Sequence, residues 1–204
     1  MKDLKETSLA DIERLEANGF AVRVFETREA AADYLDAAID GKTVGMGGSV
    51  TLAELNAYER LSQHNTVYSH QAGGDPAEQR RLAATADVYL LSANAIAAET
   101  GELLNIDGMG NRVSASLYGH EKVIFVAGRN KISPDFHAAY QRLRNVVAPK
   151  NAQRLQRKTP CAAKADRCYN CSSPDRICCG LVVHMKPMRG LPTEVILINE
   201  ELGY

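Results

Sequence analysis

The feature that most constrains the fold of this chain is a regular alternation of short apolar segments with amphipathic helical ones. Apolar runs of strand length occur at residues 21–25, 43–46, 66–70, 87–92, 122–127 and 195–198. The segments between them carry apolar residues at helical spacing, as Ala31, Leu35 and Ile39 do. Strand–helix repeats of this length predict an α/β fold with a doubly wound, mostly parallel sheet flanked by helices.

Cap residues indicate where the expected helices begin. Thr27 is suited to cap one helix, and Asp75, which precedes a proline, is suited to cap another. Thr51 and Glu54 have the spacing of a capping box. The sequence therefore predicts a helix that begins at Thr51 and runs to about Leu61.

The alternation breaks after the strand at residues 87–92. Residues 102–106 and 112–117 are predicted to be the two strands of an inserted β-hairpin, joined by a glycine-containing turn. A basic helix and a C-terminal cysteine loop follow later in the chain. We expect a single domain over residues 1–204, with the α/β core at 19–148, the basic helix and cysteine loop at 149–190, and the final strand within 191–204.

Composition and charge narrow the class of protein. Hydrophobic residues make up 45% of the 204 residues, charged residues 24%, and the formal net charge is −1. A balance this close to neutral gives no sign of a nucleic-acid or membrane partner. Residues 1–6 are charged with no apolar stretch behind them, which argues against a secretory signal, and the longest apolar runs are far too short to span a membrane. We expect a cytoplasmic protein.

A glycine turn between a predicted strand and a predicted helix is the first candidate binding site. Residues 45–51 read Gly-Met-Gly-Gly-Ser-Val-Thr. Gly47 and Gly48 let the backbone approach a ligand, free amides at a helix N-terminus attract a phosphate or carboxylate, and Ser49 adds a hydroxyl. The turn is not a dinucleotide fingerprint, because Val50 stands where a third glycine belongs. A tight turn without a ligand is the alternative.

Polar residues after other predicted strands are expected at the same sheet edge. Asn94 follows the most apolar strand, and Lys131 follows the strand at 122–127, so both can face an anion held by the glycine turn. Asn105 and Asp107 lie in the turn-rich stretch 105–112, which begins at the end of the next predicted strand. Glu102 is the candidate catalytic carboxylate, as a base or a nucleophile. The alternatives are a surface charge for Lys131, a solvated hairpin tip for Asn105 and Asp107, and a mere strand start for Glu102.

All five cysteines lie between residues 161 and 179. Cys161, Cys168, Cys171 and Cys178 follow the pattern Cys-x6-Cys-x2-Cys-x6-Cys, and Cys179 is adjacent. An odd, clustered set argues against a disulfide framework, and four thiolates in one loop suit tetrahedral zinc or an iron–sulfur cluster. The spacing does not choose between these two. A redox disulfide between Cys168 and Cys171, or unligated thiols, are the alternatives.

A basic stripe precedes the cysteines. Residues 142–167 contain eight Lys or Arg residues and a single acid, Asp166. Because few aromatic residues accompany these charges, a solvated or protein-docking face is favoured and nucleic acid is an unlikely partner.

Several of these segments together resemble the lactate-utilisation (LUD) domain family. The resemblance runs from about residue 19 onward and is carried by residues 47–52, 86–88, 92–96, 101–113 and 128–132. The long match at 101–113 is the most specific. Residues 173–178 are similar to the tail of a cysteine-containing branch, in which Cys178 matches the fourth cysteine and Cys179 stands where another residue is usual.

The resemblance implies a fold akin to ribose-phosphate isomerases, glucosamine-phosphate deaminases and coenzyme-A transferases. It also implies a part in L-lactate oxidation, in which a LUD protein works beside iron–sulfur subunits. We therefore expect a component of L-lactate or related 2-hydroxy-acid oxidation, with a small carboxylate or phosphate ligand. The expected ligand-binding residues are Gly47, Gly48, Ser49, Asn94, Asn105, Asp107 and Lys131. A non-catalytic, metabolite-sensing regulatory module is one alternative, and a coenzyme-A transferase or sugar-phosphate isomerase that uses Glu102 is another.

Overall fold

Six parallel strands form the main sheet, in the order β1-β10-β7-β4-β2-β3. The structure is a computed structural model that describes residues 9–204, so the charged N-terminal residues lie outside the described part. The strands are β1 (Ala21–Phe25), β2 (Thr43–Met46), β3 (Thr66–Ser69), β4 (Val88–Leu91), β7 (Lys122–Gly128) and β10 (Thr193–Ile198). They confirm the predicted α/β fold with a mostly parallel sheet flanked by helices.

Three helices cover one face of this sheet: α2 (Arg28–Ala38), α3 (Val50–Glu54) and α4 (Ala57–Leu61). Side chains alternate between the two faces along each strand, so Val44 and Met46 of β2 point to the same side. There they join Leu35 of α2 and Leu52 of α3 in one buried cluster. Thr27 caps α2 as expected, because its side-chain oxygen accepts a hydrogen bond from the Ala30 amide.

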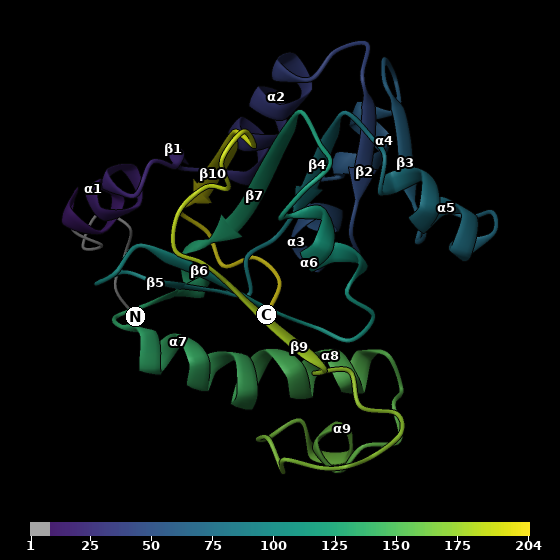
Figure 1. The fold of residues 1–204 in the computed structure, drawn as a ribbon, viewed down its shortest axis with the longest axis vertical. Coiled ribbons are helices and arrows are strands. Elements are labelled where there is room, and N and C mark those ends of the chain that lie inside the picture. The colour runs from purple at the N-terminus through teal and green to yellow at the C-terminus, as the bar shows by residue number, and fades with distance from the viewer. Residues whose placement is uncertain (1–8) are drawn as a thin grey trace.

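A second sheet covers much of the opposite face (Figure 1). Its order is β8-β5-β6-β9, with antiparallel pairing except between β5 and β8. Its strands are β5 (Ala95–Ala97), β6 (Glu102–Asp107), β8 (Ile132–Ser133) and β9 (Gly180–His184). Ile96 and Leu103 pack against Phe125 of β7, together with residues of α1 (Leu9–Ala17), α5 (Pro76–Ala83) and α6 (Asn111–Ala115).

A long helical run forms the outermost layer, below β5, β6 and β9 in Figure 1. It consists of α7 (Phe136–Arg142), a π-helical turn η2 (Leu143–Val147) and α8 (Ala148–Arg154). Ala139 and Leu143 are fully buried against Ala95 and Leu104 of the second sheet. The cysteine segment, which contains α9 (Pro160–Lys164), hangs below α8 and returns to the second sheet through β9. Among the described helices, none is both long and apolar enough to cross a bilayer.

The predicted β-hairpin is wrong, because residues 111–115 form α6 and only the first strand, β6, exists. The apolar residues Val113 and Ala115 alternate with polar ones, which mimics a strand, yet both are buried on a short helix. β6 already has a neighbour on each side, β5 and β9, so no edge is left for a hairpin partner. Gly110, at a φ of +85°, turns the chain into α6.

The predicted helix at residues 51–61 is also corrected. Ser49, and not Thr51, is the cap, because its hydroxyl accepts a hydrogen bond from the Leu52 amide at 3.2 Å. The helix is then interrupted at Asn56, whose φ of +50° separates α3 from α4. The capping box of Thr51 and Glu54 does not form, which leaves the Thr51 hydroxyl available for other contacts.

Candidate functional site

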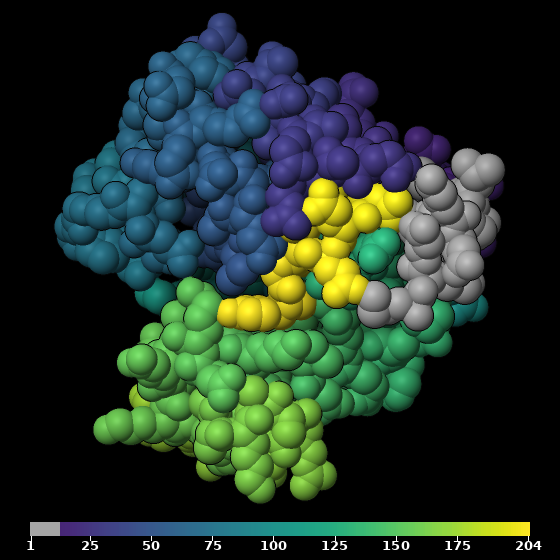
Figure 2. Space-filling view, turned by 180° about the vertical axis from the view of Figure 1, so that it is seen from behind, coloured from purple at the N-terminus to yellow at the C-terminus, as the bar shows by residue number. Residues whose placement is uncertain are grey.

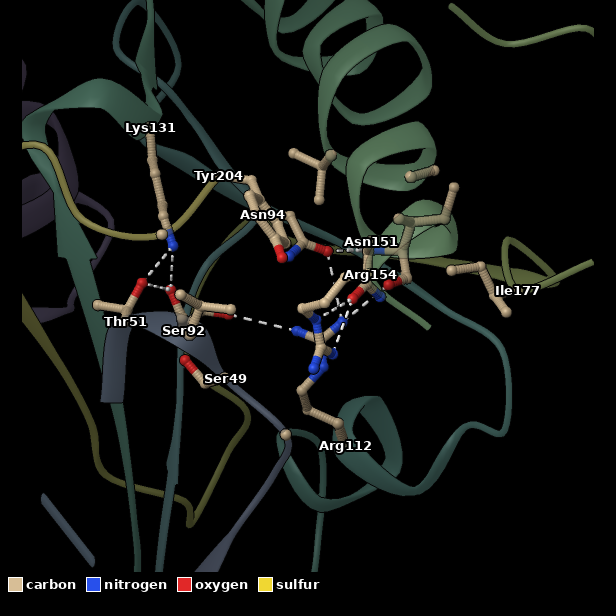
Figure 3. Close-up of a pocket in the computed structure, with 16 residues that line it drawn as sticks. Ser49, Thr51, Ser92, Asn94, Arg112, Lys131, Asn151, Arg154, Ile177 and Tyr204 are labelled. Carbon is tan, nitrogen blue, oxygen red and sulfur yellow. Dashed lines mark hydrogen bonds between the residues drawn. The ribbon is translucent and has the colours of Figure 1, made fainter. Parts of the chain in front are cut away.

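The carboxyl ends of three neighbouring strands open into one cavity, at the sheet edge where open α/β folds place their ligands. The glycine turn follows β2, Ser92 follows β4, and the 3-10 turn η1 (Arg129–Lys131) follows β7. We call this space the inner cavity, and its volume is ≈ 80 Å³. Its wall includes Gly48, Ser49, Thr51, Ser92, Asn94, Ile106, Arg112, Lys131, Asn151, Arg154, Ile177 and Tyr204 (Figure 3).

Lys131 is the buried cation of this cavity, with only 3% of the residue exposed. Its Nζ donates hydrogen bonds to Thr51 Oγ1 at 2.7 Å and to Ser92 Oγ at 2.6 Å. Figure 3 shows the ammonium and the two hydroxyls facing one another. An ammonium group has three donors, so one N–H of Lys131 is not used by these two partners.

The electrostatics of Lys131 are those of a cation with no carboxylate of the described residues in contact. Burial, followed by the nearby charges of Arg142 and Arg112, lowers the pKa of Lys131 to about 7, although the more distant charge of Glu54 acts to raise it. Within the described part of the chain, no carboxylate lies within 4.0 Å of its Nζ. A bound anion would supply the missing charge and favour the protonated amine.

The C-terminal residues form the wall above Lys131. In Figure 2 this segment, coloured yellow, lies between the purple and blue helices of the first half and the green α7–α8 region. The amide of Leu202 donates to Asn130 Oδ1, and that of Gly203 donates to Glu54 Oε2. A Cβ atom at Gly203 would lie only 2.7 Å from Thr51 Oγ1, so this close approach, at a φ of +61°, needs glycine.

Arg112 organises the rest of the inner cavity, although the sequence assigned it no function. Its Nη1 donates to Asn105 Oδ1 at 2.7 Å and to the Ser92 carbonyl at 3.3 Å. Its Nη2 donates to the Ile106 carbonyl at 2.7 Å and to Asn94 Oδ1 at 3.3 Å. Its Nε lies 3.3 Å from Asp107 Oδ2. The four N–H donors of Nη1 and Nη2 thus have partners within the protein and Nε is in ion-pair contact with Asp107, so the role of Arg112 is to hold the site together.

Asn94 and Asn105, predicted as ligand groups, belong to this network. Asn105 is fully buried, and its Oδ1 also accepts from the Asn94 amide at 3.0 Å. Asn94 Oδ1 accepts from the Ile106 amide at 2.9 Å. Of the two, Asn94 lines the inner cavity, while the Nδ2 of Asn105 has no hydrogen-bond partner among the described atoms. Both side-chain oxygens are engaged by the protein.

The glycine turn serves close packing as much as ligand access. The Gly47 amide donates to the Leu90 carbonyl at 3.3 Å, so the prediction of a free amide there is wrong. A Cβ atom at Gly47 would lie 2.9 Å from both Cγ and Cδ of Arg112. Gly48 and Ser49 do line the cavity, with the Ser49 hydroxyl also engaged as the cap of α3.

The two predicted acids lie in different places. Asp107 Oδ1 accepts the amides of Met109 and Gly110 at 3.1 and 3.0 Å, while its other oxygen faces Arg112. Glu102 begins β6, where its Oε2 accepts from Thr100 Oγ1 at 2.8 Å. Four strand residues, roughly 13 Å, separate Glu102 from Ile106 at the cavity. The structure does not bring Glu102 to the site.

A larger space, the outer cavity, adjoins the inner one and has a volume of ≈ 290 Å³. Asp107 lines this part. The residues that line both cavities are Gly48, Ile106, Arg112, Asn151, Arg154 and Ile177. The two spaces are therefore two ends of one groove.

The cysteines do not gather around a common point. Among the described residues, no group of three or more Cys, His, Asp or Glu side chains could hold a metal ion. Cys168 Sγ instead accepts hydrogen bonds from Arg144 Nε and Nη2 at 3.2 and 3.0 Å, and Arg176 Nε lies 3.1 Å from Cys178 Sγ. This arrangement does not fit a four-thiolate shell of Cys161, Cys168, Cys171 and Cys178, so the zinc or iron–sulfur site stays a prediction.

Sequence reasoning missed Ser92, Arg112 and Arg154 as site residues. Ser92 and Arg112 lie in segments that had been singled out, and Ser92 had the signal of following a buried strand. Arg154 lies on the basic helix, and nothing in the sequence indicated that α8 returns to the groove.

Comparison with known proteins agrees with this architecture. No curated protein matches the chain. A solved structure, a DUF162 family protein from Deinococcus radiodurans, is similar with a TM-score of 0.53 at 14% identity, over 97% of this chain and 99% of that one. At this identity the likeness shows the fold. The family model for the LUD domain matches residues 11–198. The chain therefore belongs to the LUD domain family.

Proposed function

We propose that the inner cavity binds the carboxylate of a small 2-hydroxy acid and that the protein is a component of L-lactate oxidation. The observation that carries this proposal is the buried ammonium of Lys131. Its described partners are neutral hydroxyls, and it lines a cavity that opens at the carboxyl ends of the strands. Burying a charge without a counter-charge is unfavourable, and a ligand carboxylate would relieve that cost.

Each residue around Lys131 has a simple part in this binding. Thr51 and Ser92 hold the ammonium by two hydrogen bonds, which leaves its third N–H for a carboxylate oxygen. Arg112 does not contact the ligand through a free donor, but its positive charge adds to the attraction. Iron–sulfur partner subunits, which the family resemblance leads us to expect, would supply the electron acceptor for the oxidation.

Calorimetric titration with L-lactate tests the proposal. Wild type should bind, and Lys131→Met should not, because the ammonium that meets the carboxylate is gone. Lys150→Met is the matched control, since Lys150 is an exposed lysine of α8 that does not line the inner cavity. Equal binding by wild type and Lys131→Met would contradict the proposal.

Proton linkage gives the same experiment a second readout. The pKa of Lys131 is about 7 in the free protein, and a bound carboxylate should raise it. L-lactate binding at about pH 8 should therefore take up protons from the buffer. Titrations in two buffers of different ionisation enthalpy measure this uptake, which Lys150→Met should keep.

A metabolite-sensing role is a second candidate, favoured by one observation. None of the described residues that line the inner cavity is an Asp, Glu or His, so Lys131 and Tyr204 are the candidates for a general base there. Turnover assays with L-lactate and an electron acceptor, in the presence of the iron–sulfur partner subunits, separate the two functions. Binding without turnover would favour the sensor.

A further inference from the structure

Three arginines besides Arg112 are among the described residues that line the outer cavity. Arg80 of α5, Arg154 of α8 and Arg157 just beyond α8 all line it. Asp107 is the acid among its described lining residues, and that carboxylate is already engaged by Arg112 and two backbone amides. Segments that are more than 70 residues apart in the sequence thus bring positive charge to one hollow.

These three guanidiniums have no counter-charge of their own. In the described part of the chain, none of them lies within 4.0 Å of a carboxylate, and Arg154 donates only to Asn151 Oδ1, at 2.9 and 3.2 Å. Arg81, the neighbour of Arg80 on the same helix, instead pairs with Glu78 at 2.7 Å and does not line the cavity. Like charges placed together repel one another, so the cluster favours an anion between them.

His70 lies at the junction of the two cavities. It lines the outer cavity, and a Cβ atom on Gly48, which lines both, would be 3.3 Å from His70 Nε2. Burial, followed by the charges of Arg80 and Arg154, lowers the pKa of His70. An anion in the outer cavity would offset the positive charges of Arg80 and Arg154, so it should raise the pKa of His70.

We infer that the outer cavity is a phosphate subsite, so that besides L-lactate the groove binds a phosphorylated 2-hydroxy acid, with its phosphate among Arg80, Arg154 and Arg157. This inference rests on the proposed function, because it takes the carboxylate of the ligand to lie at Lys131. Phosphate fits better than a second carboxylate because its doubly charged group can meet several guanidinium forks at once. The greater volume of the outer cavity, ≈ 290 Å³ against ≈ 80 Å³, suits the bulkier group.

The test compares racemic glycerate with racemic 3-phosphoglycerate, which differ only in the phosphate. At constant ionic strength, wild type should bind the phosphorylated acid at least about tenfold more tightly. The double variant Arg80→Gln/Arg157→Gln should lose this gain but keep its affinity for glycerate. Arg81→Gln/Lys158→Gln is the control, because it removes two exposed positive charges next to the same residues without touching the cavity lining.

The two proposals fail in different ways in this experiment. If the phosphate brings no gain, or if the gain survives in Arg80→Gln/Arg157→Gln, the phosphate subsite is overturned. If Lys131→Met binds glycerate as well as wild type does, the proposed function fails. A titration of the His70 ring by NMR supplies an independent check: 3-phosphoglycerate should raise its pKa and glycerate should not, and an equal response to both would contradict the subsite.

Discussion

The inner and outer ends of the groove differ in whether their arginines have carboxylate partners among the described residues. At the inner end, Arg112 is nearly buried, with 12% of its side chain exposed. Its Nη1 and Nη2 donate hydrogen bonds within the protein, and its Nε is in ion-pair contact with Asp107. At the outer end, Arg154 and Arg157 are exposed, and no carboxylate of the described chain pairs with them. The difference teaches that arginine is tied into the fold at one end of the groove and, among the described residues, left without an ion pair at the other, where we propose that it recognises a ligand. Inner substitutions should damage stability, whereas outer ones should spare it.

The largest effect is expected for Arg112→Met. This change removes the guanidinium and leaves Asp107 and the carbonyl of Ile106 without their partner. Loss of one member of a buried, hydrogen-bonded ion pair typically costs about 3–5 kcal/mol of unfolding free energy. Urea denaturation measures the cost, and Arg81→Met, at an exposed ion pair, is the control. If Arg112→Met lowered the unfolding free energy no more than Arg81→Met does, Arg112 would not be a structural residue of the groove.

A pH-dependent effect is expected next, from Lys131. Burial lowers its pKa in the folded protein to about 7, from the usual lysine value of 10.5. Between about pH 7 and pH 10.5 the unfolded chain binds more protons than the folded protein, so the free energy of unfolding rises with pH. The full destabilisation caused by burying this amine is present below about pH 7. One unit of pKa corresponds to about 1.4 kcal/mol, so the stability of wild type relative to Lys131→Met should increase by a few kcal/mol over this range.

Denaturation curves of both proteins at about pH 6.5, 8 and 9.5 test this linkage. The difference between the two unfolding free energies should change steadily with pH. A difference that stays flat would mean that the amine of Lys131 is solvated in the folded state.

A smaller loss of stability is expected for substitutions at the glycine turn, and it should differ between Gly47 and Gly48. Gly47→Ala places a methyl group 2.9 Å from Arg112 Cγ and Cδ, so the arginine must shift. Overpacking of this kind costs about 1–3 kcal/mol. Gly48→Ala meets the ends of the His70 and Gln71 side chains, at 3.3 and 3.4 Å, and should cost less. Thermal unfolding of the two variants checks the order, and the reverse order would show that Arg112 is not held where the turn meets it.

The smallest effects are expected at the outer arginines. Arg80→Gln and Arg157→Gln should each change the unfolding free energy by less than about 0.5 kcal/mol, because neither side chain has an ion pair to lose in the described part of the chain. Relief of repulsion can make the change stabilising, and added salt should reduce it. Urea denaturation at low and high salt measures both. A large loss of unfolding free energy in either variant would show that the arginine stabilises the fold.

The sequence predicted the main sheet well because each strand carries its own signal. β4 and β7 are continuous apolar runs, and Thr27 and Asp75 cap the helices where expected. The second sheet was missed because β9 pairs with β6 across 77 residues, as Asn105 and Val182 do, and three-residue β5 is too short to show a period. Long-range pairing of short segments leaves no local pattern.

The site was only partly predictable for the same reason. Lys131, Asn94 and Ser49 were found because residues after parallel strands share an edge. The function of Arg112 was missed because its partners are backbone carbonyls and amide side chains, which no motif records. Glu102 was chosen for its chemistry, but the direction of β6 carries it away from the cavity.

The position of Ile177 couples the cysteine segment to the groove. Ile177 lines both cavities, directly precedes Cys178, and lies against Gly108, whose Cβ would meet the Ile177 carbonyl at 3.0 Å. The amide of Cys179 also donates to the Asp107 carbonyl at 2.9 Å. Because Ile177 is bonded to Cys178 in the chain, a displacement of Cys178 would move a wall of the groove. By thermodynamic reciprocity, if oxidation of Cys178 changed the affinity of the groove for a ligand, that ligand would change the oxidation equilibrium of the thiol by the same coupling free energy.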